Sequence, residues 1–514
     1  MQNLKMSNSQ TNNKRIAKNT IVLYVRMFFS MLVGLYTSRV IIDALGVEDY
    51  GLYNLVGGFV IMFSAVQSGL VSASQRFINI SLGYKDRDRL RHIFSTIMII
   101  YIFLTILAFI LVESLGVYFF DSHLNIPIER ISAAKWTFHF SVITLIATLL
   151  GAPFNALIIA HERMQAFAYI SIIDVIAKFL IAESVYFVGF DKLVVYSILL
   201  GIESLVIQFI YSFYCLKHFD ETKIDWTIDW KLIKEIYSFA VWSMMGGFAF
   251  MGFTQGINVV LGMFFAPSVV AARGIANQVQ SVVKNFANNF QTAVYPQIFK
   301  SYSSGDFDYF EKLLIVSSKY SYILLFVMSL PFIFEGEEIL GLWLVHVPKD
   351  SALFLRLILF TILFDSMTTP YERAIHASGR VKYYSITTSL TFLSIAPMSY
   401  FILKLGAESY SVFVVQLVIT ILAVFIRMYM AKKIVNVNLK SFSCKCLFPI
   451  LKVSVLSVVP SLIVYYALED GIIRLILVSV LSLISVLFFT YYFGMSNHEK
   501  NICLRTIKSK LSFF

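Results

Sequence analysis

Six polar side chains recur at intervals of three and four residues within the long, otherwise largely apolar segment 268–299. They are Arg273, Asn277, Gln280, Lys284, Asn288 and Gln291. These intervals place all six on one face of an α-helix. Such a face could line a water-filled cavity that accepts a hydrophilic cargo, or it could hydrogen-bond to a neighbouring helix.

Single basic residues also lie inside apolar segments near the amino terminus. Arg26 and Arg39 fall in the segment 19–42, and Arg76 falls in the segment 52–80. A charge left in hydrocarbon is costly, so such residues should face a cavity or a partner. Guanidinium groups bind diphosphate in a bidentate manner. For Arg39, which lies near the outer end of its segment, anchoring at the membrane surface is the alternative.

These observations predict a cavity lined by cations and amides, which suit a cargo with an anionic head and sugars. The predicted substrate-binding residues are Arg26, Arg39, Arg76, Gln255, Asn258, Arg273, Asn277, Gln280, Lys284 and Asn288. The sequence alone does not show which of these faces converge.

Acidic residues occur near the middle of two further apolar segments. Asp174 and Lys178 are four residues apart in 167–189, and Asp365 lies in 351–376. Opposite charges at positions i and i+4 of a helix pair with each other, which would merely permit their burial. The alternative is a site whose protonation or cation binding is coupled to transport. Asp174, Lys178 and Asp365 are the candidate residues for coupling to H+ or Na+.

The composition excludes a soluble enzyme, a disordered chain and a secreted disulfide scaffold. Hydrophobic residues make up 58% of the 514 residues, charged residues make up 14%, and the mean hydropathy is +0.75. A chain of this composition is typical of a polytopic, all-α membrane protein. About fourteen stretches are long enough to cross a bilayer. They are 19–42, 52–80, 92–118, 134–160, 167–189, 193–216, 236–262, 268–299, 313–334, 351–376, 383–404, 409–431, 447–467 and 471–494.

The formal charge of +11 comes from short Lys and Arg clusters between the apolar segments. They form no stripe or patch of the kind that binds nucleic acid, so no nucleic-acid partner is predicted. Their distribution predicts that both termini are cytoplasmic. The chain has no G-x-x-x-x-G-K-[ST] motif and no Ser/His/Asp or Cys/His constellation in a plausible site. Cys444 and Cys446 alone make no metal site. Neither an enzyme nor a cofactor is predicted.

The sequence contains a weak internal repeat at an offset of 217 residues. Pro153 then aligns with Pro370, and Arg163 aligns with Arg380. Unless the match arises by chance among apolar residues, it predicts two parallel six-helix bundles around a central cavity. The predicted domains are 1–216 (first bundle), 217–235 (cytoplasmic linker), 236–432 (second bundle) and 433–514 (two additional helices and a tail).

The chain resembles the Wzx-type polysaccharide flippases of the multidrug/oligosaccharidyl-lipid/polysaccharide exporter superfamily. The resemblance covers nearly the whole length, and the paired Pro153 and Pro370 motifs add to it. Its other residues are Asn19-Thr20, Ser38-Arg39, Leu45-Gly46, Tyr50-Gly51-Leu52-Tyr53, and the run from Ala271 to Gln280. It implies a MATE-like fold and translocation of undecaprenyl-diphosphate-linked oligosaccharide across the bacterial cytoplasmic membrane by alternating access.

The same resemblance implies membrane lipid, a polysaccharide polymerase and a chain-length regulator as partners. Arg26 and Arg273 occupy places comparable to cationic residues of the related lipid II flippases. The alternatives are a multidrug/cation antiporter of the same superfamily and, less favoured, a membrane glycan polymerase or ligase. The cationic excess within the spans opposes the antiporter, and the short outer connections oppose the polymerase or ligase.

Overall fold

The fold was examined in a computed structural model. The structure describes residues 26–61, 70–71, 73–75, 77–78, 81–82, 87–122, 126–161, 163–223, 229–497 and 499–501. Within these residues the regular structure is entirely helical. Eleven of the described helices are long and apolar enough to cross a membrane. The chain is therefore a multi-pass, all-α membrane protein, as its composition predicts.

The number of spans remains a prediction at fourteen. The three predicted segments outside the eleven helices lie at 52–80, 236–262 and 268–299. They coincide at least in part with helices α2 (Val47–Ile61), α8 (Trp230–Phe264) and α9 (Pro267–Ser303). Part of 62–86 lies outside the described residues.

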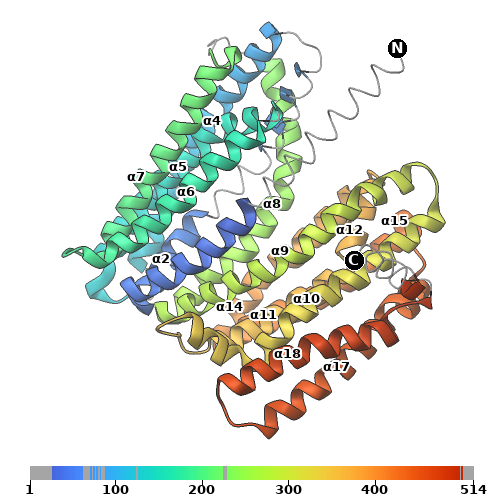
Figure 1. The fold of residues 1–514 in the computed structure, drawn as a ribbon. Coiled ribbons are helices and arrows are strands. Elements are labelled where there is room, and N and C mark those ends of the chain that lie inside the picture. Colours follow the sequence, from blue (N-terminus) through green and yellow to red (C-terminus); the bar gives the residue numbers. More distant parts are fainter. Residues whose placement is uncertain are drawn as a thin grey trace, which may run out of the picture. The chain divides into compact units, whose positions relative to one another are not determined.

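The chain divides into two compact units, Met1–Ala271 and Ala272–Phe514. The first described helix of the first unit is Arg26–Leu45, from which Gly46, with a φ of 80°, leads into α2. Its other helices are α4 (Arg87–Ser122), α5 (Ile131–Ala160), α6 (Met164–Ser184), α7 (Lys192–His218) and α8 (Figure 1). Helix α5 packs along α7, and Asp191 and Asp229 cap the amino termini of α7 and α8.

The second unit contains most of α9 and the helices that follow it. These are α10 (Phe307–Trp343), α11 (Ser351–Ser366), α12 (Thr369–Ala377), α13 (Lys382–Leu393), α14 (Ile395–Lys404), α15 (Ser411–Val435), α16 (Leu439–Phe442), α17 (Phe448–Ala467) and α18 (Ile472–Phe489). One predicted span, 351–376, is interrupted between α11 and α12, and Pro370 starts the second piece. At the matching position of the first unit, Pro153 stays inside an unbroken α5.

The boundary between the units falls after α8, whereas the sequence places the division at the 217–235 linker. Helix α8 groups with the first unit because it contacts α2 closely. Gly58 lies beneath the side chains of Gln255 and Asn258, and Gly262 lies beneath Leu55. The division into 1–216, 217–235, 236–432 and 433–514 remains a prediction.

The connection after α7 is partly ordered against the first unit. A short 3₁₀ helix, Asp220–Thr222, packs on α4, where Arg91 Nε donates a 2.7 Å hydrogen bond to the Lys223 carbonyl. Glu221 pairs with His161, whose ring stacks on Phe219. Burial raises the pKa of Glu221, but the hydrogen bond with His161, a backbone hydrogen bond and the charges of His161 and Arg87 together outweigh it, so this pKa lies below its usual value.

Two buried ion pairs join the carboxyl-terminal hairpin α17–α18 and its tail to α10. Arg474 donates two 2.8 Å hydrogen bonds to Glu335, whose side chain is fully buried. Lys319 Nζ lies 2.8 Å from both carboxylate oxygens of Glu499. The two predicted additional helices are thus joined to the second unit by ion pairs as well as by apolar packing.

Candidate functional site

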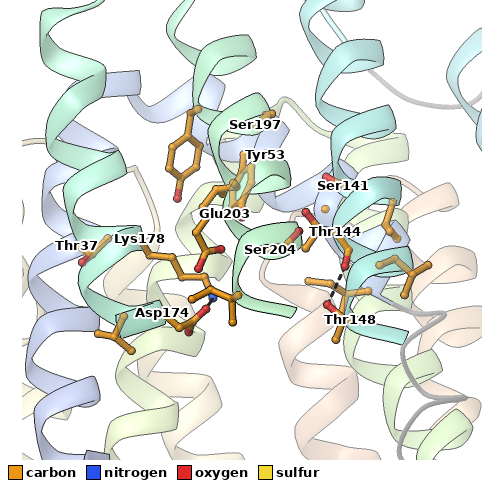
Figure 2. A pocket seen from close by; sticks show the side chains of 18 of the residues that line it. Thr37, Tyr53, Ser141, Thr144, Thr148, Asp174, Lys178, Ser197, Glu203 and Ser204 are labelled. Carbon is orange, nitrogen blue, oxygen red and sulfur yellow. Dashed lines mark hydrogen bonds and ion pairs between the residues drawn. The ribbon is translucent and has the colours of Figure 1, made fainter. Parts of the chain in front are cut away.

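The first unit encloses a cavity of about 540 Å³ between five of its helices. The first helix, α2, α5, α6 and α7 all contribute to its wall. Its polar lining residues are Ser30, Thr37, Tyr53, Ser141, Thr144, Thr148, Asp174, Lys178, Tyr196, Ser197, Glu203, Ser204 and Gln208. Figure 2 shows many of these side chains directed into one space. Helices whose outer surfaces are apolar therefore surround a cavity whose wall combines polar groups with apolar surface.

The charged part of this cavity is a cluster of three side chains. Lys178 Nζ lies 2.6 Å from Oδ1 of Asp174, one turn away on α6. Glu203 of α7 approaches this pair (Figure 2). Glu203 is only 7% exposed, and its Oε1 has no hydrogen-bond partner among the described residues. The cluster thus contains two carboxyl groups and one ammonium group.

Glu203 is the cavity residue that the sequence analysis misses. Its signal is an acidic side chain inside the apolar segment 193–216, the same signal that singles out Asp174. Asp174 also has a basic residue one turn away, which makes a local pattern. The partners of Glu203 lie on another helix, so only the packing of α6 against α7 reveals them.

Uncharged groups complete the cavity wall. Thr144 and Thr148 of α5 donate to backbone carbonyls one turn earlier, with hydrogen bonds of 3.1 and 2.7 Å. The rings of Tyr53 and Tyr196 meet edge to face at 5.2 Å. At Gly57, a Cβ atom would meet no other atom within 4 Å, so this part of the wall is open.

The predicted cations of the first unit have different surroundings. Arg26 is partly buried, and its guanidinium lies 5.0 Å from the centre of the Phe167 ring and 3.4 Å from Ser171 Oγ. Arg39 is exposed on the surface of the unit. Arg76 lies outside the described residues.

The predicted amides of α8 bond to each other. Asn258 Nδ2 donates a 2.8 Å hydrogen bond to Gln255 Oε1, and the pair packs over Gly58 of α2. Asn258 is buried, and Gln255 is partly buried.

The polar face of α9 is buried to different depths along its length. Arg273 is buried, Asn277, Gln280 and Lys284 are partly buried, and Asn288 is exposed. Gln291 is also buried, and its Oε1 accepts a 2.6 Å hydrogen bond from Tyr295. On this face, Lys284 acts electrostatically on Asp365.

Asp365 belongs to a polar cluster centred on Arg427 of α15. Nη1 of Arg427 lies 3.0 Å from Asp365 Oδ1 and donates to Thr368 at 2.8 Å. Its Nε donates to the Tyr384 hydroxyl at 3.0 Å, and Nη2 lies 3.5 Å from Glu372. Arg427 is 4% exposed, and the interruption between α11 and α12 brings these oxygens to it. The sequence analysis does not single out Arg427, although it is a lone cation within the predicted span 409–431.

The described residues contain no group of three or more His, Cys, Asp and Glu side chains that could hold a metal ion. What the two units offer instead are ion pairs inside membrane-spanning segments and a polar cavity. Such groups are typical of transport pathways through membranes.

Solved structures place the fold among exporters. The lipid II flippase MurJ, in an inward closed conformation, matches with a TM-score of 0.73 at 17% identity, over 92% of this chain and 98% of that one. An inward-facing multidrug resistance MATE family transporter of the MOP superfamily matches with a TM-score of 0.63 at 12% identity, over 82% and 99% of the chains. The predicted MATE-like fold is thereby confirmed.

Residues 16–302, more than half of the chain, match the family model described as "Polysaccharide biosynthesis protein", and the chain belongs to this family. The uncharacterized membrane protein EpsK of Bacillus subtilis (strain 168) is 20% identical over 285 residues. That match spans 54% of this chain and 55% of the relative. The chain is thus a member of this polysaccharide biosynthesis family with a MATE-like fold.

Proposed function

We propose that the protein moves undecaprenyl-diphosphate-linked oligosaccharide repeat units from the inner to the outer leaflet of the bacterial cytoplasmic membrane by alternating access. The observation that carries this proposal is the cavity of about 540 Å³ in the first unit, whose wall contains hydroxyl, carboxyl and ammonium groups among apolar helices. Polar volume at membrane depth is costly to maintain and serves a hydrophilic cargo. The family match supports a cargo that belongs to polysaccharide synthesis.

The substrate-binding role is assigned to the cations and amides that the sequence singles out. Arg26 and Arg76 would engage the diphosphate from the inside, and Arg273 and Arg39 would receive it outside. Between these points, the head group or the glycan would contact Lys284 and the amides Gln255, Asn258, Asn277, Gln280 and Asn288. The polyprenyl tail would remain in the bilayer during the transfer.

Transport would be driven by an ion gradient acting on Asp174 or Asp365, or by removal of the product. Each carboxylate already has a cation beside it, Lys178 at 2.6 Å and Arg427 at 3.0 Å. A metal ion such as Na+ would have to displace that cation, whereas a proton neutralises the carboxylate in place. These contacts favour H+ as the coupling ion.

In the cell, both termini would be cytoplasmic, because the Lys and Arg residues favour that side. A polysaccharide polymerase and a chain-length regulator would act on the same lipid-linked product. The main rival is a multidrug/cation antiporter, which the structural likeness to a MATE transporter favours. A membrane glycan polymerase or ligase is not favoured, since the fold is that of transporters.

The test is deletion of the gene followed by analysis of lipid-linked glycan. The expected result is accumulation of an undecaprenyl-diphosphate oligosaccharide on the cytoplasmic leaflet and loss of surface polysaccharide. Wild-type protein should restore the polysaccharide, whereas Arg273→Ala should fail despite normal protein levels. Arg380→Ala, at an exposed site, is the matched control. Unchanged surface glycan together with increased drug sensitivity would overturn the proposal in favour of the antiporter.

A further inference from the structure

Hydroxyl groups in the cavity of the first unit are arranged as hydrogen-bond acceptors. Six of them donate their own proton to a backbone carbonyl three or four residues earlier in the same helix. They are Thr37 of the first helix, Ser141, Thr144 and Thr148 of α5, and Ser197 and Ser204 of α7. Ser197 also hydrogen-bonds to the Thr137 hydroxyl at 3.0 Å. A hydroxyl that donates in this way retains its lone pairs for a second partner. The helices thus turn these side chains into acceptors on the cavity wall.

Glu203 adds a stronger acceptor to the same wall. Its side chain is 7% exposed, and Oε1 has no partner among the described residues. An unsatisfied buried polar atom is unfavourable, so a ligand that donates a hydrogen bond there gains affinity. Lys178 supplies the charged donor nearby, but its ammonium group already contacts Asp174. Acceptors therefore predominate in this cavity.

The shape of the cavity suits a small ring-shaped ligand. A volume of about 540 Å³ lies within the range of small-molecule pockets. Tyr53 and Tyr196 present aromatic surface, and Gly57 leaves the wall open between the first helix and α2. A sugar ring carries hydroxyl donors around its edge and apolar C–H groups on its faces, so it matches both kinds of surface (Figure 2).

We propose that this cavity is a carbohydrate subsite that receives a sugar of the lipid-linked cargo and excludes its diphosphate. Phosphate oxygens are acceptors with negative charge, so a wall lined by acceptors disfavours them. The cargo would thus be bound in parts, with sugar and diphosphate at separate places. This inference rests on the proposed function and adds a binding site for the glycan.

The subsite is tested by sugar binding to the full-length protein in lipid nanodiscs. Saturation-transfer NMR with the methyl glycoside of N-acetylglucosamine as the probe, and inorganic diphosphate as the competitor, reports the contact directly. In the wild-type protein the probe should bind, and diphosphate should not displace it. Gly57→Leu should abolish the signal by filling the cavity. Gly341→Leu, at a second helical glycine with open space, is the matched control and should leave the signal unchanged.

A second pair of variants tests the hydroxyl acceptors. Thr144→Val with Thr148→Val should weaken probe binding about threefold to tenfold, because two modest hydrogen bonds are lost. Thr105→Val is the control, since Thr105 of α4 is also buried and also donates to a carbonyl one turn earlier, but does not line the cavity. The subsite would be overturned if the wild-type protein and all four variants bound the probe equally. Displacement of the probe by diphosphate would also overturn it.

The outcomes distinguish this inference from the proposed function. If the wild-type protein restores surface glycan but does not bind the probe, the subsite is wrong and the flippase assignment stands. If the wild-type protein binds the probe and Gly57→Leu does not, the subsite is supported. If the wild-type protein at the same time fails to restore surface glycan, the assigned cargo is wrong.

Discussion

Arg427 and Asp365 form an ion pair of 3.0 Å between two helices of the second unit, at a point where one predicted span is interrupted. The same guanidinium group also contacts Thr368, Tyr384 and Glu372. One buried cation therefore satisfies oxygen atoms from α12, α13 and the turn between α11 and α12. Because it joins all of these elements, Arg427 should stabilise the second unit as a whole.

Arg427→Met should lower the free energy of unfolding by about 3–5 kcal/mol, the usual cost of leaving a buried charge without its partner. The double variant Arg427→Met with Asp365→Asn should lose less than the sum of the two single variants, because the residues interact directly. Thermal unfolding of purified protein in detergent measures both effects. Arg380→Met provides an exposed control, and strictly additive losses would contradict the direct pairing.

Removal of the carboxyl-terminal helices should expose two orphaned charges on α10. A chain ending at Asn438 would leave Lys319 and Glu335 without Glu499 and Arg474. Such a truncated protein should yield little folded material, as judged by size-exclusion chromatography in detergent. Adding Lys319→Met and Glu335→Gln should recover part of the yield, because neither replacement carries a charge into the membrane. A truncated chain that is fully stable without these changes would show that the ion pairs are dispensable.

The contact between His161 and Glu221 should make stability depend on pH at the acidic end. The pKa of Glu221 lies below its usual 4.5 in the folded protein, so the unfolded chain binds the proton more readily. The stabilisation is therefore fully present above pH 4.5 and is lost as the pH falls through the lower, folded-state pKa. Glu221→Gln should reduce the fall in melting temperature on acidification. Glu129→Gln, at an exposed position, should leave the pH profile unchanged.

Gly151 of α5 should tolerate no side chain, because Gln208 of α7 lies directly over it. A Cβ atom there would overlap with the end of the Gln208 side chain. Gly151→Ala should destabilise the first unit by about 1–3 kcal/mol through overpacking. Gln208→Ala in the same chain should restore stability, and Gly341→Ala should show no loss because its surroundings are open. Failure of the second change to rescue the first would disprove this packing.

Much of the fold could be predicted from the sequence, since hydrophobic length and composition are properties of each segment alone. The low charge content and the long apolar stretches define a multi-pass helical membrane protein before any contact is known. The polar face of α9 follows in the same way from the spacing of Arg273, Lys284 and their neighbours. The family resemblance extends this to the MATE-like architecture. The break between α11 and α12 at Thr368 could not be predicted from Pro370, because Pro153, which aligns with Pro370 in the repeat, lies inside an unbroken α5.

The candidate sites could be predicted only in part, because spacing along a helix specifies a face but not what lies opposite. Asp174 and Lys178 pair within one helix, so local sequence suffices to connect them. Glu203 joins them from α7, and Arg427 reaches Asp365 from α15. The sequence by itself determined a hydrophobic chain of helices with charged residues inside the membrane. Only the tertiary structure decided which charges meet and where polar side chains enclose a cavity, because these depend on the packing of helices that are distant along the chain.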